Sequence, residues 1–242
     1  VVLASAKKVF FAGGDLNDLL AAEPGNEALF METLRNTKAV LRRLEKLPAP
    51  VVAAINGAAL GGGFECCLAC DYRVMSSAAR VGLPETKLGI IPSWGGTVRL
   101  PRIIGVDESL MWIAAGKDQR PDAALKAGAV DSVVEPDHLR AAALATLQRA
   151  IDGKLDYQGR REAKRGPMVI NDVEATMAFF TGKAMIGQQA GKNYPAPVAA
   201  ATAIETARKM DLEGALEVEA ATFAKLAQGP VARALVGVFL AD

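Results

Sequence analysis

The chain has 242 residues, of which 28 are basic and 27 acidic, and its net charge of +1 gives no overall field that would attract nucleic acid or an anionic membrane. A chain of this length buries about three-quarters of its unfolded surface, so it needs neither a disulfide nor a metal ion to hold a core. The hydrophobic fraction of 51% is broken by charges, and no uninterrupted apolar run reaches the ~18 residues of a membrane span. The start of the chain lacks a secretory signal, and we expect a cytoplasmic protein.

The first 150 residues alternate between strand patterns and helix patterns. The first run, Val1–Ser5, reads as a buried strand in which the chain opens without a turn or cap, so we expect the N-terminal strands of the domain to be missing. Further strands are predicted at 51–55, 73–76 and 130–134, and helices at 26–47, 63–70, 97–104 and 123–127. This alternation indicates an α/β domain over residues 1–150.

The pattern changes after about Ile151. Residues 152–167 are polar and basic, and the remainder is almost wholly helical in pattern, including residues 199–210 and 213–227. We therefore predict a mainly helical segment over residues 151–242, with the change of architecture between residues 153 and 167.

Several residue types that commonly carry chemistry are scarce. His138 is the only histidine. The sequence therefore disfavours a histidine as catalytic acid or base and a metal site built from several histidines, and we predict no metal site. The sequence has neither a glycine-rich dinucleotide fingerprint nor a phosphate-binding loop, so we expect this chain to bind no NAD and to use no cofactor. Cys66, Cys67 and Cys70 read as reduced, buried residues rather than as a zinc site or a disulfide framework.

Two glutamates stand in unusual settings, and with one histidine available, proton transfer would fall to carboxylates. Glu65 follows three glycines near a predicted helix start, and Glu85 follows Pro84 after a short apolar segment. If the fold brings them together, one can act as base and the other as acid on a single water molecule. The alternative is structural: Glu65 complements a helix N-terminus, and Glu85 lies in an exposed first turn.

The glycine-rich segments at residues 11–15 and 61–63 form a second group. A backbone N–H at a glycine-rich helix start can approach a ligand oxygen without an intervening side chain. Two such N–H groups, one from each segment, would stabilise a thioester enolate. Both segments can equally be ordinary tight turns.

Three motifs in a fixed order carry a resemblance to a known family. "FFAGGDL", "AAINGAALGGGFE" and "GLPETKLGIIPSWGGTVRLPRIIG" together resemble the enoyl-CoA hydratase/isomerase family and its crotonase fold of repeated ββα units. The resemblance implies that Glu65 and Glu85 flank the water that adds to a trans-2-enoyl-CoA, and that the N–H groups of Gly14 and Gly62 form the oxyanion hole. The implied activity is that of an enoyl-CoA hydratase of fatty-acid β-oxidation, which yields a 3-hydroxyacyl-CoA.

The helical segment after residue 150 resembles one particular group of proteins within this family. "VEATMAFFTGKAMIGQQAGKNYPAPVAAATAIETA" and the ending "ARALVGVFLAD" look like the segment that joins hydratase and 3-hydroxyacyl-CoA dehydrogenase parts in multifunctional fatty-acid oxidation α subunits. This implies a longer parent chain, in which NAD and dehydrogenase activity would belong to a further domain. It also implies a thiolase β subunit as a partner, and homo-oligomerisation stays open.

Ser93 departs from the family pattern, in which glycine commonly follows the proline of the "IIP" segment. Its hydroxymethyl group is expected near the substrate, where it would crowd the water or the acyl chain. Two alternatives to hydration stay open. One is Δ3-Δ2-enoyl-CoA isomerisation, in which one carboxylate shuttles a proton without adding water. The other is a non-catalytic acyl-CoA-binding or assembly module.

Overall fold

Two parallel sheets form the centre of the first half of the molecule. The computed structural model describes residues 1–13 and 27–241. The larger sheet has the strand order β1-β3-β5-β7 and the smaller has β2-β4-β6, and every pairing between these strands is parallel. The strands are β1 (Val2–Ala4), β2 (Phe11–Ala12), β3 (Val52–Ile55), β4 (Ala58–Leu60), β5 (Tyr72–Ser76), β6 (Arg80–Gly82) and β7 (Ser132–Val134).

Consecutive strands alternate between the two sheets. β1, β3 and β5 join the larger sheet, while β2, β4 and β6 join the smaller one. The next described helical elements after these pairs are α2 (Glu27–Glu45), α3 (Gly62–Ala69) and the 3₁₀ helix η1 (Pro84–Leu88). The expected repetition of ββα units is therefore confirmed.

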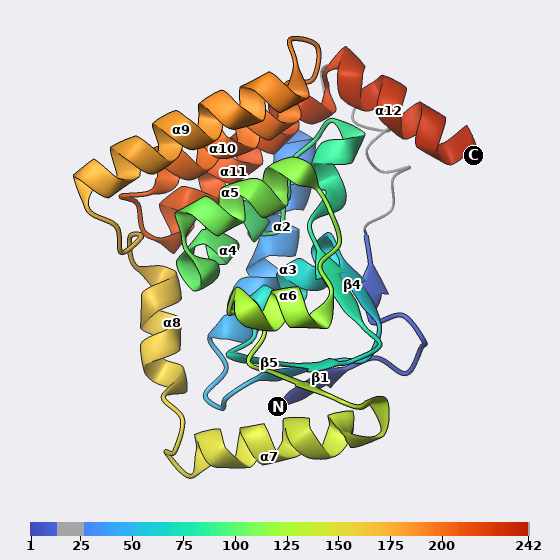
Figure 1. The fold of residues 1–242 in the computed structure, drawn as a ribbon, viewed down its shortest axis with the longest axis vertical. Coiled ribbons are helices and arrows are strands. Elements are labelled where there is room, and N and C mark those ends of the chain that lie inside the picture. The colour runs from blue at the N-terminus through green and yellow to red at the C-terminus, as the bar shows by residue number, and fades with distance from the viewer. Residues whose placement is uncertain (14–26, 242) are drawn as a thin grey trace.

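The strand β3 is covered on both faces. Val52 and Ala54 pack in a cluster with α7 (Leu139–Ile151), whereas Ala53 and Ile55 belong to the main core. Successive side chains of a strand point to opposite faces, so a strand covered on both sides needs an unbroken apolar run. In Figure 1, α7 lies on the outer side of this sheet, while α4 (Gly96–Ile104) and α5 (Val106–Ala115) lie on the opposite side.

Some elements differ from the sequence prediction. β4 and α5 were not predicted, because a three-residue strand beside glycines and a helix without a side-chain N-cap give weak signals. The helix α8 (Tyr157–Arg165) lies inside the polar, basic stretch for which no helix was predicted. The first strand was expected to be buried, but β1 is only partly buried because it lies at the edge of its sheet.

The described chain after β7 is helical wherever it is regular. α10 (Ala196–Ala207) packs against α5, α9 (Asp172–Ala190) and α11 (Leu212–Ala227), and α11 packs against α2, so this segment covers the helices of the first half (Figure 1). A mainly helical C-terminal segment is thus confirmed, while a domain boundary near residue 150 stays a prediction. The remaining helices are α6 (Pro121–Lys126), the 3₁₀ helix η2 (Pro136–His138) and α12 (Pro230–Ala241).

The apolar helices of this segment are short or bent. Within residues 1–13 and 27–241, no single helix is long and apolar enough to cross a membrane. α11 and α12 meet the length and composition requirement only as a pair, and they are joined at a bend of 73°.

Candidate active site

The turn from β4 into α3 places Glu65 and depends on glycine. Gly61 has a φ of 56°, a left-handed conformation that glycine adopts without steric cost. A Cβ at Gly63 would lie 1.9 Å from the carbonyl oxygen of Phe11, so only glycine lets β2 run this close to the helix start. Glu65 follows in the first turn of α3 and is 1% exposed.

The carboxylate of Glu65 binds the N-terminus of a different helix. Its Oε1 accepts hydrogen bonds from the backbone N–H of Trp94 at 2.7 Å and of Gly96 at 2.6 Å. Both donors lie at the start of α4, where N–H groups without intrahelical partners and the helix dipole favour a negative charge. Glu65 therefore does complement a helix N-terminus, but that of α4 rather than that of its own helix.

The surroundings of Glu65 shift its ionisation toward neutral pH. Burial, together with the negative charge of Glu219 in α11, raises the pKa of Glu65 from 4.5 to about 8. The N–H groups of Gly96 and Trp94 and the charge of Arg99 act in the opposite direction. A carboxyl group with such a pKa can accept or release a proton near neutral pH.

Glu85 lies in η1 and is held differently. Its Oε2 is buried and has no hydrogen-bond partner among the described residues. Burial, followed by the negative charge of Glu65, raises the pKa of Glu85 well above its ordinary value. The fold thus brings the two glutamates together, and the alternative that Glu85 lies in an exposed turn is wrong. A Cβ at Gly61 would lie 3.0 Å from Oε1 of Glu85, so this glycine leaves room for the carboxyl group.

The predicted oxyanion hole is placed only in part. Gly62 is the first residue of α3, so its N–H has no partner within the helix. A Cβ at Gly62 would lie 2.6 Å from a ring carbon of Trp94, so glycine is needed for the ring to approach the helix start. The other predicted donor, Gly14, lies outside the described residues.

Ser93 lies in the loop that carries the donors to Glu65. It is partly buried and immediately precedes Trp94. The ring of Trp94 in turn lies 5.9 Å, between centroids, from that of Phe11. Ser93 is therefore close in sequence to the site, and crowding of the substrate by its hydroxymethyl group stays a prediction.

A buried ion cluster that the sequence analysis missed lies next to this loop. Arg99 is fully buried and donates to both carboxylate oxygens of Glu45, at 2.8 and 3.0 Å, and to the carbonyl oxygen of Trp94 at 2.7 Å. Burial alone would raise the pKa of Glu45, but the charge and hydrogen bonds of Arg99 lower it to about 2. Glu219 is also fully buried. Its spacing of four residues from Phe223, a core residue on the same helix, was a signal in the sequence that could have identified it.

The remaining candidates for chemistry stay outside this site. The described residues contain no group of three or more histidine, cysteine, aspartate or glutamate residues that could hold a metal ion, and His138 is exposed. The three cysteines are free, as expected. Burial raises the pKa of Cys66 to about 12, which keeps its thiol protonated and unreactive.

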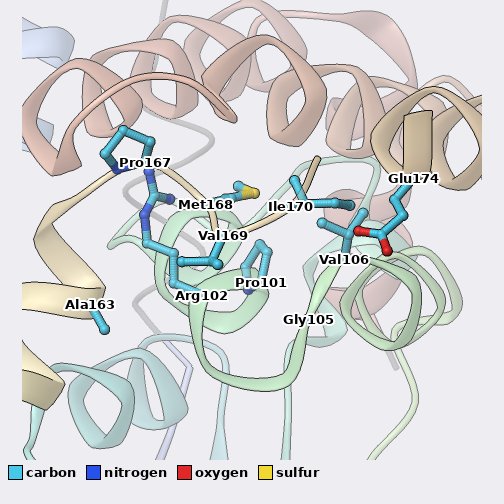
Figure 2. A pocket seen from close by; sticks show the side chains of 10 residues that line it. All are labelled: Pro101, Arg102, Gly105, Val106, Ala163, Pro167, Met168, Val169, Ile170 and Glu174. Atoms are coloured by element: carbon cyan, nitrogen blue, oxygen red, sulfur yellow. The ribbon is translucent and has the colours of Figure 1, made fainter. Parts of the chain in front are cut away.

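A separate pocket of about 380 Å³ lies between α4, α8 and the start of α9. Figure 2 shows Arg102 and Glu174 on opposite sides of it, with mainly apolar side chains between them. Neither Glu65 nor Glu85 lines this pocket. Its lining residues are Pro101, Arg102, Gly105, Val106, Ala163, Pro167, Met168, Val169, Ile170 and Glu174.

The fold and the paired glutamates agree with the family to which the sequence is related. A family profile described as enoyl-CoA hydratase/isomerase matches residues 1–164, and the chain belongs to this family. Two curated relatives carry the name "Fatty acid oxidation complex subunit alpha". The protein from Pseudomonas putida is 51% identical and that from Pseudomonas entomophila 50% identical, in both cases over all 242 residues. The chain spans only 34% of the length of these relatives.

Solved structures with the same fold include other members of the family. An enoyl-CoA hydratase from Bacillus anthracis is 34% identical, with a TM-score of 0.57 over 78% of this chain and 70% of that chain. An enoyl-CoA hydratase/isomerase from Xanthobacter autotrophicus is 26% identical, with a TM-score of 0.66 over 100% of this chain and 76% of that chain. These similarities confirm the predicted crotonase fold.

Proposed function

We propose that this chain is an enoyl-CoA hydratase that adds water to trans-2-enoyl-CoA thioesters in fatty-acid β-oxidation. The observation that carries the proposal is a pair of glutamates in different surroundings, Glu65 fully buried and Glu85 partly buried with its Oε2 enclosed. Glu65 accepts two backbone N–H groups, whereas Oε2 of Glu85 has no partner among the described residues. Two carboxyl groups in such different environments are suited to act as base and acid on one water molecule. Membership of the enoyl-CoA hydratase/isomerase family supports the same activity.

The surroundings suggest which glutamate has which role. Glu65 is the base, because the N–H groups at the start of α4 stabilise its ionised form. It accepts a proton from water as the water oxygen bonds to C3 of the thioester. Glu85 is the acid, because burial and the charge of Glu65 favour its protonated form, and it donates its proton to C2. The double bond becomes a single bond, and the proton on Glu65 passes back to Glu85 before the next turnover.

The thioester carbonyl oxygen gains negative charge as water adds. We assign its stabilisation to the N–H of Gly62 at the start of α3 and to that of Gly14. One well-aimed donor of this kind contributes about 3–4 kcal/mol to transition-state stabilisation. Because hydration involves proton transfer without oxidation or reduction, we propose that the reaction requires no cofactor.

The direct test is hydration of crotonyl-CoA and of a longer decenoyl-CoA, followed by the loss of enoyl-thioester absorbance and by identification of the product. Glu65→Gln and Glu85→Gln should each lower kcat by about 10²–10⁴-fold, because each removes one proton-transfer group. Both variants should remain folded by circular dichroism, since glutamine has a similar volume and its oxygen can still accept the N–H groups that bind Glu65. Glu174→Gln, at an exposed position, is the matched control and should retain full activity.

The same assay separates the alternatives. Conversion of 3-enoyl-CoA to 2-enoyl-CoA without formation of hydroxyacyl-CoA would identify an isomerase, for which one carboxyl group suffices. Binding of crotonyl-CoA without turnover in a folded protein would identify a binding or assembly module. Unchanged turnover in both glutamine variants would refute the assigned roles.

The wider setting is proposed from the relatives, since the chain spans only 34% of their length. We propose that the chain works within a fatty-acid oxidation complex, with a thiolase β subunit as partner and a dehydrogenase domain that uses NAD in a longer parent chain. A cytoplasmic location and homo-oligomerisation stay predictions from the sequence. Co-purification of the parent protein with a thiolase would support this setting, and a parent protein that purifies without any partner would contradict it.

A further inference from the structure

We propose that Glu219 and Tyr194 are positioning residues for Glu65 and Glu85, so that the helical segment completes the active site. The inference rests on the hydratase function proposed above. Both residues lie beyond residue 164, where the match to the family profile ends. Glu219 binds the start of α4, which holds Glu65. Tyr194 binds η1, which contains Glu85.

Glu219 holds the start of α4 from the side opposite Glu65. The N–H groups that alternate with the Glu65 donors, those of Gly95 and Thr97, donate to Glu219 at 2.8 and 3.0 Å. The hydroxyl of Thr97 donates to the same carboxylate at 2.6 Å. The turn is therefore shared between two carboxylates, and it cannot shift toward one of them without loosening its bonds to the other.

Glu219 is held as firmly as the turn that it binds. It is fully buried, and its Oε1 lies 3.1 Å from Nζ of Lys38 in α2. A buried carboxylate persists only when it is paired and hydrogen-bonded, and here both conditions are met. Gly95 has a φ of 105°, and a Cβ there would lie 1.8 Å from Nη1 of Arg99, so this position of the turn requires glycine.

Tyr194 acts on the other glutamate. It lies between α9 and α10, and its hydroxyl donates to the carbonyl oxygen of Thr86 at 2.6 Å. Thr86 follows Glu85 in η1, and its own hydroxyl donates to the carbonyl oxygen of Ile113 at 2.9 Å. η1 is thus fixed from α5 on one side and from the helical segment on the other.

Small displacements of catalytic groups have large effects on rate. A shift of about 1 Å in a reacting group can cost about a hundredfold in rate. Because Glu219 sets the position of the N–H groups on either side of Gly96, a donor to Glu65, its loss should displace the base. Because Tyr194 binds only one carbonyl of η1, its loss should displace the acid less.

The first test is Glu219→Gln, with Glu217→Gln as the matched control. A glutamine side chain has one acceptor oxygen and an NH₂ group in place of the other. Either the donors to Oε1, the Gly95 N–H and Lys38, or the donors to Oε2, the N–H and hydroxyl of Thr97, must therefore lose their acceptor. We expect kcat for crotonyl-CoA to fall by about a hundredfold with little change in KM. Glu217 lies on the same helix, exposed and paired with Arg35, and its variant should match the unmodified protein.

A pH profile separates positioning from mere stabilisation. The charged and titratable groups that face Glu65 are Glu219 from α11, Glu85 from η1 and Arg99 from α4. Removing the negative charge of Glu219 should move the acidic arm of the kcat/KM profile to lower pH. A folded Glu219→Gln protein with unchanged kcat and an unchanged pH profile would overturn the role of Glu219, even if its melting temperature fell.

Tyr194→Phe keeps the proposal testable if Glu219→Gln does not fold. This change removes only the hydroxyl, and we expect kcat to fall by about tenfold with KM unchanged, a smaller loss than for a displacement of a full ångström. Tyr157→Phe is the control, because the Tyr157 hydroxyl accepts a hydrogen bond from the exposed side chain of Gln158, away from both glutamates. An unchanged kcat in Tyr194→Phe would overturn the role of Tyr194.

Amide hydrogen exchange distinguishes failure of this inference from failure of the proposed function. Peptides that cover residues 92–99 should exchange faster in Glu219→Gln than in Glu217→Gln, whether or not the protein turns over substrate. An unmodified protein inactive on all thioesters, combined with faster exchange in Glu219→Gln, would reject the hydratase function but retain the structural coupling. Equal exchange in an active enzyme would reject the coupling alone.

Discussion

The two glutamates of the site differ in what surrounds them. Glu65 lies among polar and charged groups: two backbone N–H donors at the start of α4, the carboxylate of Glu219 and the buried guanidinium of Arg99. Glu85 lies in η1 with one carboxyl oxygen buried and without a partner among the described residues. Burial raises the pKa of both. The difference shows that burial alone does not assign roles, because the local donors decide which of two buried carboxyl groups can hold a charge.

The largest expected effect comes from breaking the charged surroundings of Glu65. Arg99→Met would remove both hydrogen bonds to Glu45 and the bond to the Trp94 carbonyl. Glu45 would keep only Arg42, which donates to its Oε2 at 2.6 Å, so the free energy of unfolding should fall by up to about 3–5 kcal/mol, measurable by urea denaturation. Arg35→Met, which breaks an exposed pair with Glu217, is the control and should leave stability nearly unchanged. Equal stability of the two variants would show that the buried cluster does not stabilise the fold.

The pH dependence of turnover tests the raised pKa of Glu65. Burial and the charge of Glu219 raise the pKa of Glu65 to about 8, and Glu65 is a base only in its ionised form. Below that pH the ionised fraction falls, so kcat/KM should decrease by about tenfold per pH unit. The measurement is initial rates of crotonyl-CoA hydration in buffers of constant ionic strength. A rate that is constant from acidic to neutral pH would contradict the raised pKa.

A pair of glycine variants tests each glutamate separately. A Cβ at Gly96 would lie 2.7 Å from Cβ of Pro92 and 3.0 Å from Oε1 of Glu65, and a Cβ at Gly61 would lie 3.0 Å from Oε1 of Glu85. Gly96→Ala should therefore alter the acidic arm of the pH profile, and Gly61→Ala the alkaline arm. Gly61→Ala should also lower the free energy of unfolding by about 1–2 kcal/mol, because its φ is positive.

Gly153→Ala is the control for this pair. Gly153 also has a positive φ, of 72°, but an added Cβ there would have no neighbour within 4 Å. It should lose stability as Gly61→Ala does and keep the full turnover rate. A similar loss of turnover in all three variants would mean that strain in the backbone, rather than crowding of the glutamates, is responsible.

The smallest effect concerns the thiol beside Glu65. Burial, and then the charge of Glu65, raises the pKa of Cys66 to about 12, so the native protein should react very slowly with a thiol reagent near pH 8 and rapidly once unfolded. Removal of that charge in Glu65→Gln should increase the labelling rate of Cys66 slightly, and Glu85→Gln should leave it unchanged. Fast labelling of the unmodified native protein would contradict the raised pKa of this partly buried thiol.

The sequence predicted the α/β class and the strands of the larger sheet, whereas those of the smaller sheet were missed, and the catalytic roles of the two glutamates stay a prediction. β3 was predictable because a strand covered on both faces must be uniformly apolar, whereas the role of the glutamates came from their resemblance to a family. Tyr194 could not be predicted and the partners of Glu219 could not be inferred, because the residues that they bind lie more than a hundred residues away in sequence. Glu219 gave one local signal, a charged residue at a core position of a helix.

The proposed hydration mechanism depends most on the assignment of Glu65 as the ionised base and Glu85 as the protonated acid. The most direct measurement is infrared spectroscopy of the carboxylic acid stretch in the unmodified protein, Glu65→Gln and Glu85→Gln, at a pH above the value of about 8 at which Glu65 titrates. We predict that the band of a buried protonated carboxyl group persists in Glu65→Gln and disappears in Glu85→Gln. A band that disappears in Glu65→Gln and persists in Glu85→Gln would contradict the assignment and exchange the two roles.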